Sequence, residues 1–111
     1  MKKILMSVLA MGAITMNVNA GDCTTNRCTN VKITEVYATF GGTLYVQTSG
    51  DESRLNCTSL ANRYVSVGAT DPGKNALYSM MLTAQTTGKN VTIRVQEGSA
   101  GCRIFYAHMN N

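Results

Sequence analysis

One segment with helical periodicity, DPGKNALYSMMLTAQTTGK at residues 71–89, lies within a chain whose other patterned runs are typical of β-strands. Asp71 and Pro72 suit the N-cap and the first helical position, and Gly88 suits the residue that ends a helix. The apolar residues have the spacing of one helical stripe: they are Ala76, Leu77, Met80, Met81 and Ala84. The segment therefore predicts a single amphipathic helix.

Five runs with strand character surround this helix, three before it and two after it. They cover about 31–40, 43–48 and 63–67 before the helix, and 90–96 and 103–108 after it. The order β-β-β-α-β-β is that of the OB-fold, a five-stranded Greek-key barrel. We therefore expect a mainly β protein with one helix, in which the apolar stripe covers an open end of a five-stranded OB-fold barrel.

The first twenty residues, MKKILMSVLAMGAITMNVNA, have the pattern of a secretory signal peptide. Lys2 and Lys3 precede an apolar run over 4–14, and small residues lead up to Ala20. That run is shorter than the roughly 20 residues that a membrane-spanning helix needs. We expect cleavage after Ala20, export to the periplasm or the exterior, and a single domain over 21–111; an uncleaved anchor is the alternative.

All four cysteines lie beyond the predicted signal peptide, where an even number in an exported chain indicates disulfides. Cys23 and Cys28 are close in sequence, so a local Cys23–Cys28 bond is expected, which leaves Cys57 with Cys102. A zinc site is the competing interpretation. The cysteine spacing lacks a C-x-x-C pair, and neither the spacing nor the compartment favours zinc.

The charge pattern is mild. Without Lys2 and Lys3, eight basic residues stand against six acidic ones, a net charge of +2. The basic residues are scattered singly along the chain, which is unlike the clustered basic surface of a nucleic-acid-binding protein. We expect no nucleic-acid partner and no membrane span.

Residue types that carry catalysis are scarce. His108 is the only histidine, and the sequence offers it no nucleophile motif. The adjacent carboxylates Asp51 and Glu52 could imitate an acid–base pair, but neighbours on a loop usually point apart. We expect a protein that is not an enzyme, with no metal and no cofactor.

Neutral polar side chains and an aromatic ring near the first two predicted strands suit a hydroxyl-rich ligand such as a glycan. The candidate ligand-binding residues are Thr29, Asn30, Tyr37, Gln47 and Thr48. The predicted helix has a second unusual feature, an outward face without charge, where soluble helices usually carry Glu and Lys. The candidate oligomer-interface residues on that face are Asn75, Ser79, Thr83 and Thr86. A generally low content of charge explains the same face without an interface.

Two segments carry a resemblance to a known family. The first is the predicted helix with the strand after it, where the residues that carry the resemblance are Leu77-Tyr78, Thr86-Thr87-Gly88 and Val91-Thr92-Ile93. This segment resembles the corresponding segment in the B subunits of pentameric AB toxins, of the subtilase-cytotoxin and pertussis-like kind. The segment VKITEVY at 31–37 is similar to that family's first strand.

The resemblance implies an OB-fold, a homopentameric ring with the helices around a central pore, sialylated glycans as ligands and a separate enzymatic A subunit as partner. Thr29 stands near the position of a sugar-contacting serine in that family, and Gln47 stands near an acidic sugar contact. Both residues therefore depart from the family's pattern. The leading hypothesis is an exported, non-catalytic, glycan-binding B component. The alternative is a monomeric periplasmic OB-fold protein with a structural or protein-binding role.

Overall fold

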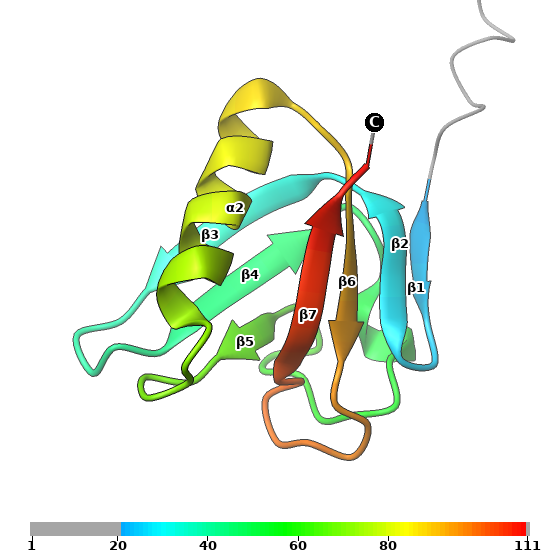
Figure 1. Cartoon of the computed structure of the whole chain (residues 1–111). Helices are drawn as coiled ribbons and strands as arrows, with labels where there is room; N and C mark the ends of the chain where they lie inside the picture. Colours follow the sequence, from blue (N-terminus) through cyan, green and yellow to red (C-terminus); the bar gives the residue numbers. More distant parts are fainter. Residues whose placement is uncertain (1–20, 111) are drawn as a thin grey trace, which may run out of the picture.

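The computed structural model describes residues 21–110, so the predicted signal peptide over 1–20 lies outside the described residues. This part of the chain is mainly β, with one α-helix and two antiparallel sheets (Figure 1). The elements in chain order are β1 (Asp22–Thr24), β2 (Arg27–Val31), β3 (Ile33–Ala38), β4 (Leu44–Thr48), the 3-10 turn η1 (Glu52–Arg54), β5 (Val65–Val67), α2 (Lys74–Thr87), β6 (Val91–Val95) and β7 (Ile104–Met109).

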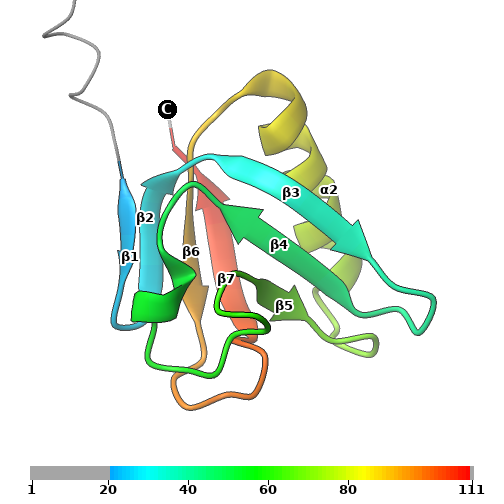
Figure 2. The same cartoon turned by 180° about the vertical axis from the view of Figure 1, so that it is seen from behind.

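The two sheets face each other across the core, as Figures 1 and 2 show from opposite sides. One sheet has the strand order β1-β2-β6-β7 and the other has the order β3-β4-β5. Only Lys32 separates β2 from β3, so one run of chain passes from the first sheet into the second. Alternate residues of the strands point inward, and the fully buried ones include Val31, Val46, Val65, Val91 and Ile93.

The polar segment 21–30, where a disulfide but no strand was predicted, forms the hairpin of β1 and β2. Cys23 and Cys28 are directly opposite each other in that hairpin and both are fully buried. The cystine therefore supplies the inward-facing apolar group that the polar composition of this segment lacks. Within residues 21–110 there are seven strands where the sequence predicted five, and Val31 belongs to β2 while β3 begins at Ile33.

The sheets do not close into a barrel within the described residues. They meet at one margin through a single isolated parallel bridge between Ser66 and Arg103, where the Ser66 N–H donates to the Cys102 carbonyl at 3.0 Å. The expected closed five-stranded barrel is therefore not confirmed. The reason is visible in the chain: β5 has only three residues, and the segment before β7 is irregular.

The disulfides are Cys23–Cys28 and Cys57–Cys102, the pairing expected from the sequence. The second bond joins the segment before β5 to the segment before β7. The same two segments are also joined by a hydrogen bond from the Gly101 N–H to the Thr58 carbonyl at 2.6 Å. Covalent and hydrogen bonds together hold this margin of the two sheets.

The helix α2 begins at Lys74, three residues after the predicted N-cap. Gly73, which has no side chain that could cap, occupies the N-cap position. The Asp71 carboxylate does not cap the helix, because it is engaged elsewhere. Asp71 accepts from the Gly68 N–H at 2.7 Å and forms an ion pair with Arg103. At the other end the prediction is confirmed: Gly88 ends the helix with φ 71°, in the left-handed conformation that glycine tolerates.

Helix α2 packs against β3 and β7, over the side where the two sheets diverge (Figure 1). Met81 and Ala84 are buried, while Leu77 and Met80 are partly buried. Ala76, predicted to share this stripe, is exposed. The stripe runs through Leu77, Met81 and Ala84, and at 100° per residue Ala76 falls to its side.

Candidate functional site

Three tyrosines gather on the outer surface of the β3-β4-β5 sheet. Figure 2 is viewed from the side of this sheet. Tyr37 on β3 and Tyr45 on β4 are directly opposite each other, and Tyr64 immediately precedes β5. The ring centroids are 5.6 Å apart for Tyr37 and Tyr45, and 5.9 Å from each of these to Tyr64. Tilted and edge-on rings at these distances are favourable aromatic contacts. We call these three residues the tyrosine face.

Polar contacts fix one ring of the tyrosine face, that of Tyr64, whereas the ring of Tyr37 is exposed. The Tyr64 hydroxyl donates to Glu35 Oε1 at 3.1 Å, and the Arg63 guanidinium lies 6.0 Å from the Tyr64 ring centroid. Tyr64 is buried, whereas Tyr37 exposes 44% of its surface. The buried ring therefore anchors the cluster, and Tyr37 presents an exposed aromatic surface.

A groove of about 510 Å³ borders the tyrosine face at Tyr45. We call it the first groove. It is lined by Thr43, Tyr45, Thr58, Ser59, Leu60, Ala61, Ser66, Gly68, Ala100, Gly101 and Arg103. Its walls come from β4, β5 and the two irregular segments that the Cys57–Cys102 bond joins. The surface of this lining is more apolar than polar, although four of its residues contribute hydroxyl groups besides Tyr45. Its only charged side chain, Arg103, is already paired with Asp71.

A second groove of about 550 Å³ follows on the same side of the molecule and contains Gln47. The second groove is lined by Gly21, Asp22, Gln47, Ser49, Gly50, Asp51, Glu52, Ala61, Asn62 and Arg63.

Ala61 lines both grooves, because it lies in a tight turn over 60–63. Ala61 and Asn62 have φ of 54° and 58°. An alanine in this region costs about 1–2 kcal/mol, so the turn between the grooves is strained, as is frequent at functional sites.

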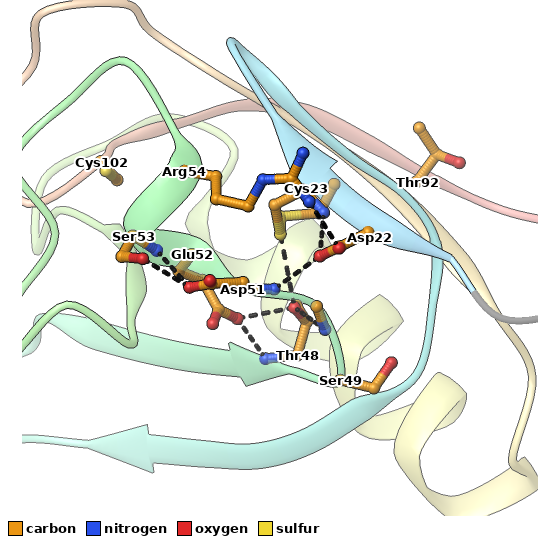
Figure 3. The surroundings of a disulfide bond; sticks show 12 residues. Asp22, Cys23, Thr48, Ser49, Asp51, Glu52, Ser53, Arg54, Thr92 and Cys102 are labelled. Carbon is orange, nitrogen blue, oxygen red and sulfur yellow. Dashed lines mark hydrogen bonds and ion pairs between the residues drawn. A yellow bond between two sulfur atoms is a disulfide. The ribbon is translucent and has the colours of Figure 1, made fainter.

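The floor of the second groove is a carboxylate network around the first disulfide (Figure 3). Asp22 accepts from the N–H groups of Asp51 and Cys23 at 2.8 and 2.7 Å and forms an ion pair with Arg54 at 2.7 Å. The hydrogen bonds from the Asp51 and Cys23 backbone, followed by the Arg54 charge, lower the pKa of the Asp22 carboxyl. The network ties the β1–β2 hairpin to η1.

Glu52 differs from its neighbour Asp51 because it is only 3% exposed. Its Oε2 accepts from the Thr48 N–H and the Thr48 hydroxyl, both at 2.6 Å. Burial raises the pKa of Glu52, and these two hydrogen bonds oppose the rise. Asp51, in contrast, is exposed and caps η1 through the Ser53 N–H, so the two adjacent carboxylates do not form a catalytic pair.

The structure separates the five predicted ligand-binding residues. Tyr37 and Gln47 share the outer surface of the β3-β4-β5 sheet. Thr48 is buried and its hydroxyl is engaged by Glu52, so it is not available to a ligand. Thr29 and Asn30 lie on β2 in the other sheet, where the Asn30 side chain accepts from Asn90 Nδ2 at 2.9 Å.

Sequence reasoning missed two of the three tyrosines. Tyr45 sits in the outward register opposite Tyr37, a placement that alternation along the predicted strands could have suggested. Tyr64 lies within the predicted strand over 63–67, but its place beside Tyr37 and Tyr45 depends on how the segment before β5 folds back, which no local pattern indicates.

The predicted interface residues Asn75, Ser79, Thr83 and Thr86 are all exposed along α2. The hydroxyls of Thr83 and Thr86 donate to the carbonyls of Ser79 and Leu82, at 2.8 and 2.7 Å. Their hydrogen-bond donors are therefore used within the helix. Leu82, which the sequence analysis did not single out, lies on this same face and is 37% exposed.

His108 is exposed on β7, and its ring stacks on Tyr106 with centroids 6.5 Å apart. Among residues 21–110, no three histidine, cysteine, aspartate or glutamate side chains converge in a way that could hold a metal ion. Within the same range, no helix has the length and apolar character to span a membrane.

No protein-family model matches this chain, and the search among curated proteins found no match.

Proposed function

We propose that this protein is an exported, non-catalytic glycan-binding protein with an OB-fold, and that it is the B component of an AB-type toxin. The observation that carries the proposal is the tyrosine face, which borders the first groove at Tyr45. Hydroxyl groups line that groove, and the second groove offers the side-chain amides of Gln47 and Asn62 beside charged side chains. Aromatic rings pack on the apolar faces of sugar rings, while neutral polar groups hydrogen-bond sugar hydroxyls. The two disulfides suit an exported chain.

The strand connections support the OB-fold part of the proposal. The run of β2 and β3 pairs with β6 through its first half and with β4 through its second half. The parallel bridge from Ser66 to Arg103 brings β5 beside the start of β7, and α2 follows β5. On this assignment β4 and β5 are the second and third barrel strands. OB-folds bind oligosaccharides on the face of those two strands and on the loops beside them, and the tyrosine face and the first groove lie there.

The uncharged surface of α2 supports a homo-oligomer, for which we propose the pentamer implied by the toxin resemblance. Thr83 and Thr86 present methyl groups outward because their hydroxyls are satisfied within the helix. Leu82 adds an apolar contact on the same face. Such a surface loses little solvation when it packs against its own copy in a neighbouring subunit.

A glycan array with the purified protein tests ligand binding, with sialylated and neutral glycans as the two arms. We expect retention of the wild type and at least a tenfold loss, about 1.4 kcal/mol, for Tyr37→Ala. Tyr78→Ala is the matched control, since Tyr78 is 37% exposed but lies on α2. Equal retention of both variants would refute the tyrosine face as the site, and a preference for neutral glycans would refute sialoside specificity.

Native mass measurement separates the leading proposal from a monomeric periplasmic OB-fold protein that binds another protein. A ring of five subunits at micromolar concentration supports the toxin component, and Leu82→Glu is expected to dissociate it. A monomer at that concentration, with no retention on the array, would favour the alternative.

A further inference from the structure

Two arginines lie side by side on the outer surface of the β1-β2-β6-β7 sheet, although 66 residues separate them in the chain. Arg27 on β2 and Arg94 on β6 are direct partners in the strand register. Both point outward, because the neighbours Cys28, Ile93 and Val95 are buried in the core. Figure 1 is viewed from the side of this sheet. Like charges directly opposite each other on a sheet are destabilising, so folding gives no reason for this placement.

Neither arginine is neutralised by the fold. Within residues 21–110, neither guanidinium has a hydrogen-bond or ion-pair partner. One carboxylate, that of Glu97, lines a hollow together with Arg94. Its two carboxylate oxygens instead accept from Asn26 and Asn56 at 3.3 and 3.1 Å. The positive charge of Arg27 and Arg94 is therefore free for an external anion.

A bulge in β7 places aromatic rings beside this charge. Arg94 pairs with Tyr106 and Val95 with Ile104, so Phe105 is the extra residue. The rings of Phe105 and Tyr106 are 5.8 Å apart, and Phe105 is 63% exposed. Phe105 and Arg94 line the same hollow of about 350 Å³. Bulges often re-aim side chains at functional sites, and here the bulge sets an apolar surface next to two cations.

We infer that Arg27, Arg94, Phe105 and Tyr106 form a second binding site, which takes a phosphorylated sugar. A phosphoryl group carries a charge of about −1.5 to −2 near neutral pH and matches two guanidiniums, each able to bind its oxygens through two N–H groups. A single carboxylate would leave one of the two charges unbalanced. The aromatic rings give the sugar ring a surface to pack on. This site lies on the opposite sheet from the tyrosine face and does not depend on the glycan proposal.

Calorimetric titration of the purified protein at constant ionic strength tests the site, with glucose 6-phosphate, inorganic phosphate and glucose as probes. We expect saturable binding of glucose 6-phosphate at or below about 10 mM, and at least tenfold weaker binding by Arg27→Gln and by Arg94→Gln. Lys89→Gln removes the same charge from an exposed position beyond α2 and is expected to bind as the wild type does. Wild-type binding by both arginine variants would overturn the site. Inorganic phosphate that binds as tightly as the ester would overturn the sugar part.

Thermal melting without ligand shows whether the arginine substitutions lower the stability of the fold, which would weaken binding without any direct contact to the ligand. Because each substitution relieves a like-charge pair, both arginine variants are expected to melt no lower than the wild type at low ionic strength, where exposed charges are least screened. A lower melting temperature for both would show that the arginines serve the fold and would overturn the inference.

Discussion

Removal of the Cys57–Cys102 bond is expected to destabilise the protein about twice as much as removal of the Cys23–Cys28 bond. The perturbation is a pair of double variants, Cys57→Ala with Cys102→Ala, and Cys23→Ala with Cys28→Ala. Alanine avoids adding an unsatisfied hydroxyl at positions that the structure buries. Three of the four cysteines, Cys23, Cys28 and Cys102, are fully buried, so each double variant also loses some packing.

The magnitude follows from the loops that the two bonds close. Cys57 and Cys102 are separated by 45 residues, and Cys23 and Cys28 by 5. A disulfide limits the conformations of the unfolded chain, and its contribution grows with the logarithm of loop length. The long loop corresponds to about 4 kcal/mol and the short loop to about 2 kcal/mol. Since a domain of this size has a free energy of unfolding of about 5–10 kcal/mol, the loss of the long loop leaves it barely folded.

Urea unfolding followed by far-ultraviolet circular dichroism measures both variants, because the chain has no tryptophan to report by fluorescence. The midpoint of the Cys57/Cys102 variant is expected to lie about 1–2 M below that of the Cys23/Cys28 variant, with similar slopes. Reduced wild type should unfold at or below the lower of the two midpoints.

Equal midpoints, or the reverse order, would refute the loop-closure reasoning. The reverse order would indicate that the buried cystine in the β1–β2 hairpin stabilises chiefly by packing, where it lies between the two sheets. A changed slope in one variant alone would indicate that its unfolded state has become more or less compact.

Three further predictions concern single positions. Gly88→Ala is expected to cost about 1 kcal/mol of stability, because the φ of Gly88 is 71° and open space surrounds it, so the cost comes from the backbone alone. Gly41 is also in open space but has no positive φ, so Gly41→Ala should cost nothing. Thermal melting of the two variants compares these costs. The hydrogen bond from Arg103, followed by that from the Gly68 N–H, lowers the pKa of Asp71. The stability that the ionised Asp71 contributes is therefore present above the ordinary pKa of an aspartate and is lost as pH falls through the lowered pKa. Asp71→Asn should destabilise the protein by about 1 kcal/mol at pH 7 and by almost nothing near pH 2. Urea midpoints of the variant and the wild type at the two pH values check this. Burial raises the pKa of Glu52, so the folded state favours the protonated acid. The stability that protonated Glu52 contributes is therefore present at low pH and is lost as pH rises through the raised pKa. Glu52→Gln should therefore gain stability relative to the wild type from pH 4 to pH 8, and the opposite trend in urea midpoints would contradict the stated cause.

Local signals in the sequence determined much of the secondary structure. The apolar stripe and Gly88 located α2 and its end, because helical periodicity and a left-handed terminal glycine depend only on neighbouring residues. The start was displaced to Lys74 because Asp71 binds Arg103, a residue 32 positions away. The hairpin of β1 and β2 was not predicted, since apart from Val31 at the end of β2 its inward-facing apolar group is a cystine.

The same difference between local pattern and tertiary contact applies to the residues of the candidate site. Outward placement of Gln47 follows from the two-residue period of β4. Tyr37 faces outward because the register shifts between Ile33 and Glu35, which breaks the alternation of β3. Thr48 faces inward by the same period of β4, since Leu44, Val46 and Thr48 are the buried residues of that strand. What the period does not indicate is that the Thr48 hydroxyl is engaged by the buried Glu52 carboxylate.

The sequence by itself determined that this is a mainly β chain with one helix, four cysteines beyond a signal-like segment, and scattered basic residues. Only the tertiary structure decided that Tyr64 joins Tyr37 and Tyr45, and that Arg27 and Arg94 form a pair. The physical reason is that strand pairing between distant segments depends on register, bulges and turns, and on the shared core. No local pattern encodes which distant strand will be the neighbour, so residues that look scattered in the sequence become adjacent only in the fold.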